Sequence, residues 1–70
     1  MTRSAAYNAL VSLLTQLERS GKNTEEIKDA AYAGLVDGPA KVEDQEIQIK
    51  AMEELNRAFA EAKENNQKPH

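Results

Sequence analysis

The sequence predicts an all-α protein: a small three-helix chain, with a long, a short and a long helix, that assembles as an oligomeric helical bundle. Two observations predict this class. Apolar residues recur at intervals of three and four, which is the period of an amphipathic helix. Glycine and proline interrupt this period at Gly21 and at residues 37–39, which divides the chain into three segments. We expect one helical domain over residues 1–65.

The first helix is expected over about residues 4–20. Ser4 is a suitable N-cap, and Gly21 can adopt the left-handed conformation that ends a helix. Its apolar residues cover an arc of roughly 200° at 100° per residue, about twice what one neighbouring helix covers. They are Ala6, Tyr7, Ala9, Leu10, Val11, Leu13, Leu14 and Leu17. The helix is therefore expected to pack against more than its own chain supplies.

The second helix is expected over about residues 24–36. Asn23 followed by Glu26 resembles a capping box, which places the helix start near Thr24. The helix is rich in alanine and contains Gly34, and such small residues let another backbone approach closely. Gly34 costs this helix about 1 kcal/mol relative to alanine.

The third helix is expected over about residues 40–65, because Pro39 has the fixed φ that suits the first turn of a helix. Its apolar stripe consists of Ile49, Met52, Leu55, Phe59 and Ala62. Residues 46–50 also alternate like a strand, but there is no second strand for them to pair with, and an isolated strand is not stable. We therefore favour the helix. Residues 66–70 are expected to form a polar disordered tail.

Length and composition point to stabilisation from outside the chain. The protein has 70 residues, of which 40% are hydrophobic, and eleven of these are alanine. Burying its large apolar side chains yields roughly 2 kcal/mol each, and ordering the chain costs more than this until backbone hydrogen bonds and alanine burial are also counted, which brings the balance near zero. The sequence contains no cysteine, so neither disulfides nor thiolate metal sites can add stability. Oligomerisation, with a dimer favoured, is the expected source.

Charge and hydropathy disfavour nucleic acids and membranes as partners. The net charge is −3, and lysine and arginine do not cluster as they do on a phosphate-binding surface. A nucleic-acid-binding bundle is thus the least favoured function. No apolar run approaches the 18 or so residues that span a bilayer, and the first residues do not resemble a signal peptide. A cytoplasmic protein without membrane contact is expected.

The sequence offers no residues for catalysis, metal binding or cofactor binding. The single histidine is His70, in the predicted tail, where it cannot hold the geometry that acid–base chemistry needs. The three glycines are scattered and form no phosphate-binding loop. The carboxylates lack the histidine spacing of a di-iron bundle. We therefore expect no enzyme and no cofactor.

Interface residues are predicted on the first and third helices. They are Tyr7, Leu10, Val11, Leu14, Leu17, Met52, Leu55 and Phe59. We expect the three aromatic residues to pack inside, with Tyr7 the first choice if one is exposed. Gln48 lies within the apolar arc of the third helix, where a buried polar group can fix register or oligomeric state. The alternative is that Gln48 is solvated because its turn extends beyond the core.

These observations support two hypotheses about function. The first is a non-enzymatic protein that self-associates and binds a protein partner as an adaptor or inhibitor. The alternative is an oligomer that binds or sequesters a small molecule, such as a nucleotide, between subunits. Its only candidate contacts are Lys22, Lys28 and Tyr7.

Overall fold

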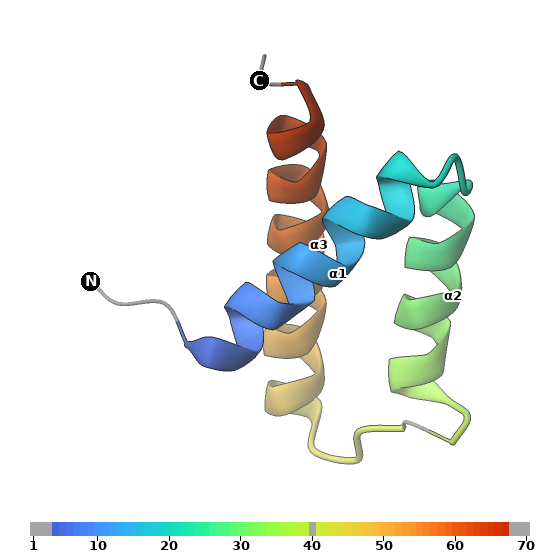
Figure 1. Cartoon of the computed structure of the whole chain (residues 1–70). Helices are drawn as coiled ribbons and strands as arrows, with labels where there is room; N and C mark the ends of the chain where they lie inside the picture. Colours follow the sequence, from blue (N-terminus) through green and yellow to red (C-terminus); the bar gives the residue numbers. More distant parts are fainter. Residues whose placement is uncertain (1–3, 40, 68–70) are drawn as a thin grey trace.

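A computed structural model of the chain describes residues 4–39 and 41–67 and shows three helices (Figure 1). They are α1 (Ala5–Arg19), α2 (Thr24–Val36) and α3 (Gln45–Gln67). The all-α prediction is confirmed, and residues 46–50 are helical rather than extended. Assembly into an oligomer stays a prediction.

The ends of α1 and the start of α2 follow local capping chemistry. The Ser4 hydroxyl accepts a hydrogen bond from the backbone N–H of Tyr7 at 3.0 Å, as expected of an N-cap. Gly21 has a φ of 83°, which glycine adopts without the clash a side chain would cause. The Asn23 side chain accepts from the N–H of Glu26 at 3.3 Å, which starts α2 one residue later.

The predicted start of the third helix, at about residue 40, is wrong. Gly38 has a φ of 124°, and the N–H of Val42 bonds back to the carbonyl of Leu35 at 2.9 Å, so the chain turns instead of entering a helix. The cap is Asp44, whose carboxylate accepts from the N–H groups of Glu46 and Ile47. Aspartate satisfies the free N–H groups of a first turn, and Pro39 cannot, so α3 begins at Gln45.

The predicted end of the third helix, at residue 65, is also wrong, because α3 continues to Gln67. The Asn66 amide donates to the Thr15 carbonyl at 3.1 Å and to the Glu18 carboxylate at 3.3 Å. These bonds to α1 hold the last turn of α3, so residues 66 and 67 do not belong to a disordered tail. The remainder of the predicted tail, residues 68–70, lies outside the described residues.

The core lies where α1 crosses α3, and α2 runs alongside α3 (Figure 1). It consists of Tyr7, Val11, Leu14, Ala58, Phe59 and Ala62. The Cα trace extends 41 × 31 × 14 Å, and its smallest extent is about that of two helices in contact. The fold is therefore only about two helices thick. Among the described residues, no large side chain is fully buried. One face of α2 and the outer side of α1 have no helix of this chain against them.

Candidate protein interaction surface

The structure divides the predicted interface residues into two groups. Tyr7, Val11, Leu14 and Phe59 are buried against one another within the chain. Leu10, Leu17 and Leu55 are half-buried and pack against this core, and Met52 is half-buried as well. Their contact with a second chain stays a prediction.

Tyr7, the first choice for an exposed aromatic residue, is buried in the structure. Its ring is 9% exposed, and its hydroxyl donates to the Glu61 carboxylate at 3.1 Å. Phe59 is buried and Tyr32 is half-buried, so the aromatic rings lie largely inside the chain. A buried tyrosine normally finds a partner for its hydroxyl, and here that partner joins α1 to α3.

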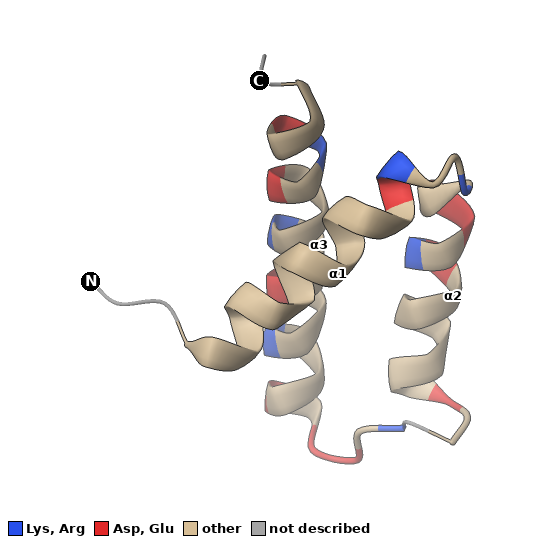
Figure 2. Ribbon diagram, viewed as in Figure 1, with Lys and Arg blue, Asp and Glu red and all other residues tan. Residues whose placement is uncertain are grey.

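The outer side of α1 is exposed and carries no charge. From Ala5 to Leu17 the helix has no Asp, Glu, Lys or Arg, while charged residues recur along α2 and α3 (Figure 2). The exposed residues that share this side recur at intervals of three and four, and we call them the outer α1 face. They are Ala5, Ala9, Ser12, Leu13 and Gln16. Leu13 is 60% exposed, the most of any large apolar residue described as exposed.

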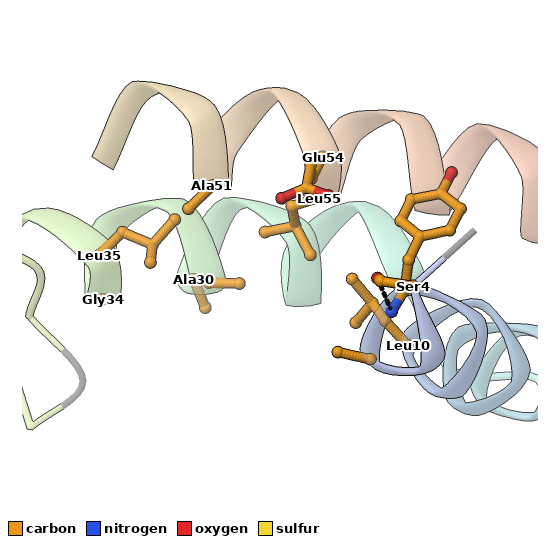
Figure 3. Close-up of a pocket in the computed structure, with 11 residues that line it drawn as sticks. Ser4, Leu10, Ala30, Gly34, Leu35, Ala51, Glu54 and Leu55 are labelled. Atoms are coloured by element: carbon orange, nitrogen blue, oxygen red, sulfur yellow. Dashed lines mark hydrogen bonds between the residues drawn. The ribbon is translucent and has the colours of Figure 1, made fainter. Parts of the chain in front are cut away.

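A groove lies beside this face, between the first turns of α1, the second half of α2 and the first half of α3 (Figure 3). Its volume is about 610 Å³. Ala51 and Leu55 of α3 form the floor, Leu10 lies on the α1 wall, and Leu35 of α2 points toward Ala51. Leu13 does not line the groove but follows Leu10 by three residues, so the outer α1 face lies next to the α1 wall of the groove.

The groove is lined almost entirely by apolar side chains. On α2 these are small, because Ala30, Ala31 and Gly34 form the wall. A Cβ built on Gly34 would meet no atom within 4 Å, so the packing of this chain does not require a glycine there. Among the described residues, Glu54 is the only charged one that lines the groove, and its carboxylate bonds to none of the others.

Gln48 has a role that the sequence did not predict. Its amide donates to the carbonyls of Leu35 at 3.0 Å and Val42 at 3.1 Å. The side chain is half-buried, so the expectation that Gln48 is simply solvated is wrong. It joins the end of α2, the following loop and the first turns of α3, which fixes the spacing of the two helices that border the groove. A role in register between chains stays a prediction.

An ion pair of Glu25 joins α2 to α3 at the end of the two helices that lies away from their connecting loop. The Lys63 ammonium lies 3.4 Å from the Glu25 carboxylate, and Lys28 lies 3.5 Å from it. The hydrogen bond from Lys63, together with the charge of Lys28, lowers the pKa of the Glu25 carboxyl below its ordinary value. All three groups are on the surface or near it, so this link is screened by salt.

The candidate nucleotide contacts are not brought together. Tyr7 lines the groove, but Lys22 and Lys28 do not. The charged group that does line the groove is a carboxylate, which would repel a phosphate.

Neither a membrane span nor a metal centre is found in the described part of the chain. No helix within residues 4–39 and 41–67 has the length and hydropathy needed to cross a bilayer. Within the same ranges, no group of three or more His, Asp or Glu side chains is placed to hold a metal ion. Comparison with protein-family models, curated proteins and solved structures gave no significant match.

The sequence places Leu13 in the apolar arc of the first helix, but the predicted set of interface residues does not include it. That set contains Leu10, Leu14 and Leu17, whereas the structure leaves Leu13 the more exposed. The signal that could have found it is the run of thirteen uncharged residues from Ala5 to Leu17. In a chain with 30% charged residues, a solvated helix face of that length would ordinarily carry charge.

Proposed function

We propose that this protein is a non-enzymatic helical protein of the cytoplasm that forms a homodimer and binds a protein partner, as an adaptor or inhibitor. The observation that carries the proposal is the exposed, uncharged outer α1 face, which includes Leu13. Centres of protein interfaces are depleted in charged residues, as this face is.

The lack of charge favours a second copy as the neighbour of this face. In a two-fold symmetric dimer the same patch meets itself, so a charge near the axis would face its own copy. Like charges placed opposite one another across an interface are unfavourable. Ala5, Ala9 and Ser12 are also small enough to let two α1 helices approach closely. We therefore assign the self-association predicted from the sequence to the outer α1 face.

Light scattering on a size-exclusion column, over a series from micromolar to millimolar concentration, tests the self-association. We expect a dimer for the wild type and a monomer for Leu13→Glu, because the charge would be buried between the two α1 helices. Ile49→Glu is the matched control, since Ile49 is 54% exposed on α3. It should remain dimeric. A wild type that is monomeric throughout the series, or two variants with the same mass, would reject the proposed surface.

A second candidate function is the binding of a small molecule in the groove, whose volume lies in the range typical of ligand sites. The lining favours an apolar molecule with a positive charge over a nucleotide, because Glu54 is the only charged residue there within residues 4–39 and 41–67. Thermal shift against a nucleotide panel tests the original alternative. A nucleotide at a hundred times its Kd would add about 2.7 kcal/mol, and we expect no shift.

A further inference from the structure

We propose that the groove between α1, α2 and α3 is the partner site, and that its occupant is an amphipathic helix of the partner with a lysine or arginine opposite Glu54. This inference rests on the proposed protein-binding function. It places partner binding in the groove and dimer formation on the neighbouring outer α1 face, so binding and dimerisation can be tested separately.

The shape of the groove suits a helix. Three helices of this chain border it, and its floor and walls present apolar side chains along their length (Figure 3). Ile47, one helical turn before Ala51, is 57% exposed and extends the apolar floor toward the start of α3. An amphipathic helix in such a groove inserts residues spaced by three, four and seven positions.

Gly34 gives an independent reason to expect an occupant. Glycine inside a helix stabilises the protein less than alanine does. At Gly34 the structure shows open space where the Cβ of another residue would lie. Gly34 also has no positive φ that would demand glycine. The fold of the chain therefore does not account for this residue. A partner helix that approaches the α2 backbone at Gly34 accounts for it.

Glu54 determines the charge of the occupant. It is exposed at the groove, and no described residue neutralises its carboxylate. A helix with an acidic residue at this point would bring two like charges together, whereas a basic residue would form an ion pair. The other described residues of the lining carry no charge, so this one contact distinguishes cationic from anionic helices.

The test uses two synthetic amphipathic helical peptides with the same Leu and Ala face, one with lysine and one with glutamate at its border. Fluorescence anisotropy measures their binding to the full chain. We expect the lysine peptide to bind at least tenfold more tightly to the wild type. Glu54→Lys should reverse this order, while Glu53→Lys, which makes the same charge change outside the groove, should preserve it.

Gly34→Leu should abolish binding of both peptides without unfolding the helices, because leucine fills the space above α2. Leu13→Glu should leave peptide binding unchanged, which separates the groove from the dimer surface. The inference is overturned if neither peptide binds the wild type, or if Glu54→Lys and Glu53→Lys have the same effect. It is also overturned if Gly34→Leu changes the mass of the assembly, since a second copy would then be the occupant.

Discussion

The side-chain amide of Gln48 donates a hydrogen bond to the main-chain carbonyl of Leu35 across the loop that joins α2 to α3, with a nitrogen–oxygen distance of 3.0 Å. The Leu35 carbonyl also accepts from the N–H of Val42. Carbonyls at the end of a helix lack partners within it, so this pairing stabilises the end of α2. It also holds α2 and α3 at the spacing that leaves the groove open between them.

Replacing Gln48 with leucine should therefore act within the chain. We expect Gln48→Leu to lower the free energy of unfolding by about 1 kcal/mol, because the Val42 carbonyl loses its partner. Urea unfolding followed by circular dichroism measures this change. Light scattering should show an unchanged mass. A changed mass would support the register role predicted from the sequence instead.

Two adjacent leucines on α1 should respond very differently to truncation. Leu14→Ala removes a buried side chain and should cost about 2–5 kcal/mol, enough to unfold much of a protein with so thin a core. Leu13→Ala removes a side chain exposed in the single chain and should change stability by less than about 0.5 kcal/mol at concentrations where the chain is monomeric. Thermal unfolding of both variants measures the contrast. Equal losses would contradict the placement of Leu14 in the core.

The end of α3 should depend on Asn66. Asn66→Ala removes two hydrogen bonds to α1 and should destabilise the protein by about 1 kcal/mol, although alanine is the better helix former. Asn56→Ala is the control, because Asn56 is exposed on the same helix and the change there should be neutral or slightly stabilising. Chemical denaturation compares the two, and amide exchange should report faster opening of the last turn only in Asn66→Ala.

The Glu25 link predicts a specific pH dependence. Because the folded pKa of this carboxyl lies below its unfolded value, its contribution to stability is complete above the unfolded pKa and is lost as pH falls through the folded pKa. Lys63→Gln should raise the pKa of Glu25 toward its ordinary value. Carbon-detected NMR titration of the carboxyl measures this shift, and Lys50→Gln should leave it unaltered. The stability difference between wild type and Lys63→Gln should shrink in acid and in high salt.

The sequence was sufficient to predict the fold class, because helical period and capping chemistry are both local. Ser4, Asn23 and Gly21 act where they were expected to act. The start and end of α3 were predicted wrongly because Pro39 and Asn66 were judged without their surroundings. The bonds that decide the end of α3 join residues far apart in the sequence, as from Asn66 to Thr15, whereas the start depends on the local cap formed by Asp44.

The candidate site could be predicted only in part. The wide apolar arc of the first helix predicted packing beyond what the chain itself supplies, and that packing stays a prediction; within the arc the structure leaves Ala6, Ala9 and Leu13 exposed. The groove could not be predicted, because it depends on how α1 crosses α3 and where α2 lies. The small residues of α2 were noted in the sequence, but their place beside Leu55 and Glu54 follows from the tertiary arrangement.

Site-specific cross-linking tests the central claim, contact between two outer α1 faces, most directly. The chain contains no cysteine, so Ser12→Cys introduces a single thiol on that face. Ala60→Cys places the control thiol at an exposed position on α3. With a short bis-maleimide reagent, we predict rapid formation of a covalent dimer by Ser12→Cys and not by Ala60→Cys. Equal rates of cross-linking for the two variants would contradict the account.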